Sequence, residues 1–240
     1  MVSSNVVGYQ KLSIPANGYA LLANPFVQVG TGSSEEPATF AINDMFADDA
    51  ANSTAGRAQT QGDQMQTWDS ATQGYTTYFY SSWVNKWALN SAPRSATTDA
   101  FDAGDGYWYL NRGDSEYSLT VSGEVSVQEV EVTLAPGYTL VCNPFPADLP
   151  LNGDSVVFAS EGATAGRAQT QGDQIQIWDI ASQGYTTYFY SSWVNKWALN
   201  SAPRVATTDS IPAGQGFWYL NRGDSDITVT LKSPLAADGE

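Results

Sequence analysis

The chain contains one block of sequence twice. Thr54 to Asp99 recurs as Thr164 to Asp209. The copies of the block differ at five pairs of positions: Met65/Ile175, Thr67/Ile177, Ser70/Ile180, Thr72/Ser182 and Ser95/Val205. Near-identity over such a length is the sequence signature of tandem copies of one structural unit. Any site built from residues of the block therefore exists twice in the protein.

Shorter matches extend the repeat on both sides of the block. Before it, Gly18-Tyr19 and Asn24-Pro25-Phe26 match Gly137-Tyr138 and Asn143-Pro144-Phe145 at an offset of 119 residues. After it, Gly106 to Ser115 matches Gly216 to Ser225 at an offset of 110 residues. Because the offset is larger before the block than after it, the first copy must contain an insertion between Phe26 and Thr54.

We therefore predict two domains, 1–123 and 124–240, with an extra loop at about 27–53 in the first. The loop is rich in Gly, Ser, Glu and Asp, so we expect it to be exposed, with a short helix at Ile42 to Phe46. Only Ser122-Gly123-Glu124 separates strand-like runs of the two copies, which is too short for a flexible tether. The two domains are expected to be closely joined.

The local pattern predicts strands throughout. Val130, Val132 and Leu134 alternate with polar residues, the period of a half-buried strand. Tyr75 to Tyr80 contains only aromatic and β-branched residues, which suit a pleated surface, and Ile227 to Leu231 is a similar run. Turn-forming pairs separate these runs. The predicted fold is all-β: two copies, each of six or seven antiparallel strands in a small sandwich or barrel.

The composition excludes several function classes. The formal net charge is −15, spread over both copies, which argues against nucleic acid and anionic membranes as partners. No apolar run is long enough for membrane insertion. We expect an extracellular or cell-surface protein, with Met1 to Ser4 standing where a leader has been removed from the mature chain.

Signatures of catalysis are missing from the sequence. The chain has no histidine, which excludes Ser-His and Cys-His nucleophile pairs and His-ligated zinc, and its one cysteine, Cys142, is expected to be a buried strand thiol. Asp63 and Asp69 recur as Asp173 and Asp179, and a carboxylate pair can hydrolyse glycosides. A β-domain of this size seldom forms the deep cleft that a glycosidase needs. We therefore expect a protein without catalytic residues.

Aromatic residues are the main candidates for a ligand site. Each copy has four tryptophans, and two of them flank a predicted hairpin turn centred on Val84-Asn85-Lys86. Exposed aromatic rings beside amide groups suit sugars, because a ring covers the C–H face while amides bind the hydroxyls. The candidate ligand-binding residues are Trp83, Trp87, Tyr78, Tyr80 and Asn85 in copy one, and Trp193, Trp197, Tyr188, Tyr190 and Asn195 in copy two. The alternative is that these rings fill the domain cores.

Two further motifs have simpler explanations. Arg112-Gly113-Asp114 and Arg222-Gly223-Asp224 are integrin-binding tripeptides elsewhere, but here they lie between predicted strands and consist of turn formers, so integrin binding is not expected. Asp102 and Asp105 are weak candidates for a structural calcium ion, the one cofactor considered. Their counterparts in copy two lack both carboxylates, which weakens a metal role for the repeat.

A pattern of turns and aromatic residues runs through both copies. It comprises Gly18 to Pro25, Gln66 to Asp69, Gly74 to Tyr78, the tryptophan hairpin and Pro212 to Trp218. In this pattern the chain resembles uncharacterised β-rich modules of large secreted or surface proteins of bacteria. The resemblance implies an exported bacterial protein and transfers no catalytic residue. We therefore predict an extracellular binding module, with bivalent weak recognition of a polysaccharide through the aromatic hairpins. The alternative is a structural spacer that contacts other surface proteins and keeps all its aromatics in the core.

Overall fold

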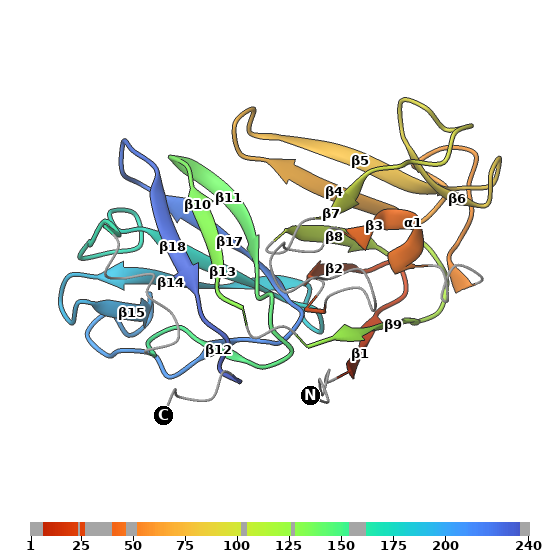
Figure 1. Cartoon of the computed structure of the whole chain (residues 1–240). Coiled ribbons are helices and arrows are strands. Elements are labelled where there is room, and N and C mark those ends of the chain that lie inside the picture. Colours follow the sequence, from red (N-terminus) through yellow and green to blue (C-terminus); the bar gives the residue numbers. More distant parts are fainter. Residues whose placement is uncertain are drawn as a thin grey trace.

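A computed structural model describes residues 7–23, 25–26, 40–46, 52–101, 105–125, 128–153 and 162–235 of the chain. The protein is all-β, and the described residues form eighteen strands and one helix of four residues. The chain divides into two similar halves that lie side by side (Figure 1).

The described residues of each half form seven strands of four or more residues and two strands of two residues. In copy one these are β1 (Val7–Ile14), β2 (Tyr19–Ala23), β3 (Phe40–Ala41), β4 (Gln64–Asp69), β5 (Gly74–Ser81), β6 (Lys86–Leu89), β7 (Ala100–Phe101), β8 (Gly106–Leu110) and β9 (Tyr117–Glu124), with α1 (Ile42–Met45) after β3. In copy two they are β10 (Val130–Leu134), β11 (Gly137–Cys142), β12 (Leu149–Pro150), β13 (Gln174–Asp179), β14 (Gly184–Ser191), β15 (Lys196–Leu199), β16 (Ser210–Ile211), β17 (Gly216–Asn221) and β18 (Ile227–Leu231).

The sheets of the two copies correspond strand for strand. Copy one has a five-stranded antiparallel sheet in the order β2-β8-β4-β5-β6, and copy two has the same sheet in the order β11-β17-β13-β14-β15. Two-stranded sheets complete each copy: β1-β9 and β3-β7 in copy one, and β10-β18 and β12-β16 in copy two. The predicted all-β duplication is confirmed.

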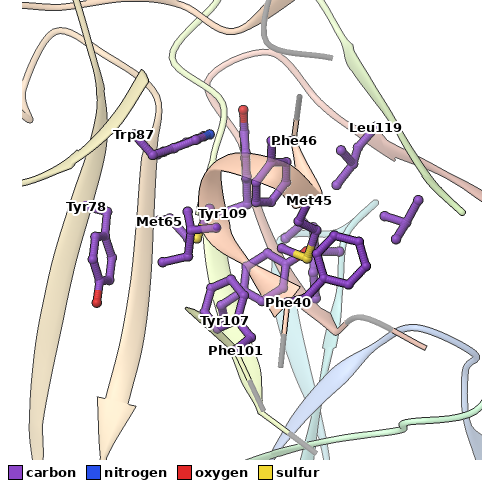
Figure 2. Packing of buried hydrophobic residues seen from close by; sticks show 14 of the residues in the cluster. Phe40, Met45, Phe46, Met65, Tyr78, Trp87, Phe101, Tyr107, Tyr109 and Leu119 are labelled. Atoms are coloured by element: carbon purple, nitrogen blue, oxygen red, sulfur yellow. The ribbon is translucent and has the colours of Figure 1, made fainter. Parts of the chain in front are cut away.

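Side-chain alternation places the core of each copy on one face of its five-stranded sheet. In β8, Tyr107 and Tyr109 point into the core of copy one, where Tyr107 stacks on Phe101 at 4.7 Å between ring centres. The opposite layer consists of β1-β9, β3-β7 and α1, which contribute Leu119 and Phe46 (Figure 2). Copy one is therefore a sandwich of one large sheet and a smaller layer.

The segment around α1 differs from the exposed loop that the sequence predicted. The short helix is present, but Phe40, Ile42, Met45 and Phe46 are buried in the core. In copy two, Leu149 and Leu151 are buried in the corresponding core. The hydrophobic residues of the insertion therefore complete a sandwich, and the rest of the predicted loop, 27–39 and 47–51, lies outside the described residues.

One asparagine in each copy attaches this layer to the sheet. The Asn43 side-chain amide donates to the carbonyl oxygens of Trp87 and Thr97, and its Oδ1 accepts from the Trp87 N–H at 2.9 Å. Asn152 makes the same three bonds to Trp197 and Thr207. The two segments are structurally equivalent although their sequences differ around this asparagine.

The other face of each five-stranded sheet packs against the other copy. Trp68 meets Trp218 and Trp108 meets Trp178, each pair edge to face with 5.1 Å between ring centres. Leu21 and Leu140 lie in the same cluster. Strands β8 and β17 are therefore buried on both faces.

Four side-chain hydrogen bonds across this interface form two equivalent pairs. Trp68 Nε1 and Gln73 Nε2 both donate to the Tyr138 carbonyl oxygen at 2.9 Å. Their counterparts Trp178 and Gln183 donate to the carbonyl oxygen of Tyr19, at 3.0 and 2.9 Å. Each contact is repeated with the roles of the copies exchanged, so the copies are related by a pseudo-two-fold axis.

The junction between the copies lies later in the chain than the sequence suggested. Ser122, Gly123 and Glu124 belong to β9, and they pair with Tyr9, Gly8 and Val7 of β1. The strands of copy two begin at Val130.

Candidate functional site

The two hairpin tryptophans of each copy lie in different environments. The β5–β6 turn comprises 82–85, so Trp83 lies within the turn and is 46% exposed. Trp87 is opposite Tyr80 in the β5–β6 pairing, points into the core and is 1% exposed (Figure 2). Trp193 and Trp197 repeat this division at 47% and 1%. The predicted platform of two adjacent exposed rings is absent, because β6 directs its second residue toward the core.

The other predicted ligand residues divide in the same way. Tyr78 and Tyr80 are buried, and so are Tyr188 and Tyr190. Asn85 and Asn195 lie exposed in the turns with a φ of 50°, the left-handed conformation that asparagine tolerates. Of the ten candidates, Trp83, Asn85, Trp193 and Asn195 are exposed to a ligand.

Two arginines lie on each exposed tryptophan. The central guanidinium carbons of Arg57 and Arg94 lie 5.3 and 4.5 Å from the centre of the Trp83 ring. Arg167 and Arg204 lie 5.4 and 4.3 Å from the centre of the Trp193 ring. All four arginines are exposed. We call each set of one tryptophan and two arginines an Arg-Trp-Arg cluster.

A buried serine positions the cluster in each copy. The Ser81 hydroxyl accepts a hydrogen bond from the Trp83 N–H at 3.3 Å and donates to the carbonyl oxygen of Pro93, the residue before Arg94. Ser191 does the same with Trp193 and Pro203. Both serines are 0% exposed. One hydroxyl therefore links the turn that carries the tryptophan to the turn that carries an arginine.

The second arginine is positioned by a close backbone contact. Gly56 pairs with the end of β5: its N–H donates to the Tyr80 carbonyl oxygen at 3.0 Å, and its own carbonyl oxygen accepts from Ser82 N–H at 2.8 Å. A Cβ on Gly56 would lie 2.3 Å from the backbone nitrogen of Gly62, so the position requires glycine. Arg57 follows directly and is thereby placed beside Trp83.

The predicted carboxylate pair is separated by a whole strand. Asp63 precedes β4 and Asp69 ends it, so about 20 Å of strand lies between them, against about 5–9.5 Å in glycosidases. Asp63 is 0% exposed and accepts hydrogen bonds from the backbone N–H groups of Arg112 and Thr54 and from the Tyr109 hydroxyl. Burial raises the pKa of Asp63, and these hydrogen bonds oppose that rise. The surroundings of Asp63 are those of a structural carboxylate.

Of the two weak metal candidates, the structure describes one. Asp105 is exposed, whereas Asp102 lies outside the described residues. Within the part of the chain that the structure describes, no group of three or more cysteine, aspartate or glutamate side chains could hold a metal ion.

The Arg-Gly-Asp turns are tied to the body of each copy. Arg112 Nε donates to the Gln59 carbonyl oxygen at 3.0 Å, and Asn111 Oδ1 accepts from the Gly113 N–H at 2.8 Å. In copy two, Arg222 Nε donates to the Gly172 carbonyl oxygen at 2.9 Å. The guanidinium groups are therefore engaged in structural contacts within the turn region.

Two shallow hollows lie at the edges of the interface. The first, of about 270 Å³, is lined by Trp178, Tyr188 and Gln215 among others. The second, of about 190 Å³, is lined by Trp68 and Tyr78 among others. Ligand pockets usually measure about 300–1,000 Å³, so both hollows are small for a ligand. The Arg-Trp-Arg clusters are the stronger candidate.

Sequence reasoning identified Trp83 and Trp193 but missed the residues around them. Arg57 and Arg94 are far from Trp83 in sequence, and no short motif joins them. One signal was present: the block carries Arg57, Lys86 and Arg94 in copy one, and the same three in copy two, which is six of the ten basic residues of the chain. Their concentration in the block could have indicated a basic surface.

Fold and site together define a tandem β-module with two equivalent exposed clusters. No protein-family model, curated protein or solved structure matches the chain. Among the described residues, no helix is long and apolar enough to span a membrane.

Proposed function

We propose that the protein is an extracellular, non-catalytic binding module. Each copy binds a polysaccharide at its Arg-Trp-Arg cluster, with Trp83 and Trp193 as the stacking rings. The observation that carries the proposal is the exposure of these two tryptophans, at 46% and 47%, while most other tryptophan surface is packed in cores or in the interface. A large aromatic ring held on the surface by fixed neighbours is a binding group at low entropic cost.

The placement of the two clusters supports bivalent binding. Figure 1 shows β6 and β15, which end the two hairpins, at opposite sides of the molecule. The interface of paired hydrogen bonds and tryptophans fixes the two copies against each other. Two weak sites on one rigid body gain avidity for a polymer when both can engage.

A second candidate function is a structural spacer of a surface assembly. Burial of six tryptophans per chain to half or more of their surface favours it: Trp87, Trp108, Trp197 and Trp218 are buried, and Trp68 and Trp178 pack against the interface cluster. In that case Trp83 and Trp193 serve to hold arginines on their turns. The two candidates differ in whether a soluble polysaccharide binds.

Retention in affinity gels that contain soluble polysaccharides distinguishes the two candidates. We expect retention by at least one polysaccharide, weakened at least about tenfold by Trp83→Ala with Trp193→Ala, because a stacking tryptophan is a typical hot spot. Tyr9→Ala is the control, since Tyr9 is 78% exposed and lies in β1, outside the clusters. Free migration in every gel would leave the spacer as the function.

A further inference from the structure

The charge of the chain is unevenly arranged. The formal net charge is −15, from 25 acidic and 10 basic residues. Trp83 nevertheless has two guanidinium groups within 5.3 Å of its ring centre, and Lys86 is exposed directly after its turn. Copy two repeats this arrangement with Arg167, Arg204 and Lys196 around Trp193. Two small cationic surfaces therefore lie on an anionic molecule.

The arginines of these surfaces have no carboxylate partner among the described residues. The one ion pair found there joins Lys232 to Glu129, at 3.0 Å, outside both clusters. The guanidinium carbons of Arg57 and Arg94 lie 5.3 and 4.5 Å from the centre of the Trp83 ring. The described hydrogen bond of Arg57 uses its backbone N–H, which donates to Gln61 Oε1. A guanidinium has five N–H donors in a fixed fork, so donors remain for a ligand.

We infer that the ligand at both Arg-Trp-Arg clusters is an anionic polysaccharide, one whose sugars carry carboxylate or sulfate groups. This inference rests on the proposed function and names its substrate class. The guanidinium forks bind the carboxylate or sulfate oxygens in a bidentate manner, and the tryptophan ring contacts the C–H face of the same or the next sugar.

Charge density favours such a polymer over nucleic acid. Duplex DNA carries one charge per about 1.7 Å, and a protein that binds it must cover many phosphates with basic residues. Each cluster and its neighbouring lysine together offer three basic side chains, and the rest of the chain is strongly acidic. A polysaccharide with charges spaced along its sugars places an anion on the cluster with less repulsion from the surrounding surface.

The test uses pairs of polymers that share a backbone and differ in charge. Dextran sulfate is compared with dextran, and polygalacturonate with its methyl ester, by titration calorimetry on the full chain. We expect the charged member of at least one pair to bind about tenfold or more tightly than the neutral member. We also expect binding to weaken as NaCl rises, because exposed charges are screened beyond about 10 Å at 0.1 M salt.

Two matched variants show where on the protein the charged polymer binds. Arg94→Gln with Arg204→Gln removes one guanidinium from each cluster and is expected to weaken binding of the charged polymer about tenfold or more. Lys11→Gln with Lys232→Gln makes the same change in net charge away from the clusters and is expected to leave the affinity unchanged. All four side chains are exposed, so thermal unfolding should be nearly the same in the two variants.

Each other outcome overturns the inference in a distinguishable way. Equal binding of the charged and the neutral member in both pairs of polymers overturns the anionic ligand and leaves the proposed function in place. Loss of binding in the lysine variant alone moves the site away from the clusters and overturns the inference together with the site of the proposed function. Tighter binding of single-stranded DNA than of either charged polysaccharide also overturns it. No binding of any polymer overturns the inference and the proposed function together.

Discussion

At the scale of single residues, two tryptophans that lie four positions apart in one hairpin have different environments. Trp83 lies in a turn and contacts two arginines, whereas Trp87 lies in β6 and contacts Phe46, Tyr80 and Tyr109 in the core. Sequence alone predicted an aromatic hairpin, but it could not show which tryptophan is exposed and which is buried. The length of the turn decides this, because it sets which face of the sheet each strand residue lies on. A turn of 82–85 places Trp87 on the same face as Tyr80.

This division predicts a large difference in stability between two chemically identical substitutions. Trp87→Ala should lower the free energy of unfolding by about 3–5 kcal/mol, because it removes a buried aromatic side chain. Trp83→Ala should lower it by about 1 kcal/mol or less, the value of exposed cation–π contacts. Urea unfolding of both variants measures the difference. Equal losses would mean that the Trp83 ring supports the fold rather than a ligand.

At the scale of the elements, the turn between β4 and β5 connects a carboxylate to the interface between the copies. Asp69 Oδ2 accepts a hydrogen bond from Thr72 Oγ1 at 2.9 Å, and Oδ1 accepts from the backbone N–H of Ala71 at 2.8 Å. These bonds lower the pKa of Asp69 below its ordinary value of 3.8. The next residue of the turn, Gln73, donates to the Tyr138 carbonyl oxygen of the other copy.

The contribution of this turn to the stability of the folded chain should therefore decrease in acid. Because the folded-state pKa of Asp69 is lowered, its stabilisation is fully present above the unfolded-state value of 3.8 and is lost as the pH falls through the folded-state value. The pKa of Asp179, in the same turn of copy two, is also lowered. We expect Asp69→Asn with Asp179→Asn to be less stable than the natural chain at pH 6 and about as stable as it near pH 2. Urea midpoints at both pH values test this, and a difference that does not change with pH would contradict it.

Sequence predicted several of the long strands but not the short buried segments, around α1 and β12, that complete each sandwich. β5, β10 and β18 follow from runs of aromatic and β-branched residues or from alternation. The equivalence of residues 40–46 and 149–152 could not be predicted, because the two segments share burial and one asparagine rather than sequence. Strands β8 and β17, which are buried on both faces, also lack the alternation that marks one exposed face. The arginine partners of Trp83 come from separate loops, so only the folded chain brings them together.

At the scale of the whole molecule, the two copies are expected to unfold as one unit. Trp108 and Trp218 each pack edge to face on a tryptophan of the other copy, at 5.1 Å between ring centres. Trp108→Ala with Trp218→Ala should lower the melting temperature and separate thermal unfolding into two transitions, because the coupling between the copies is lost. Scanning calorimetry measures both effects. Trp83→Ala with Trp193→Ala removes the same number of tryptophans and should keep a single transition.

The pseudo-two-fold interface has a consequence beyond a single chain. Each copy presents a surface that is complementary to the equivalent surface of the other, as in a symmetric dimer. Copy one of one chain therefore fits copy two of a second chain with the same tryptophan pairs and hydrogen bonds. Two chains that exchanged halves at high protein concentration would close into a swapped dimer. Such a dimer would carry four Arg-Trp-Arg clusters on one body in place of two.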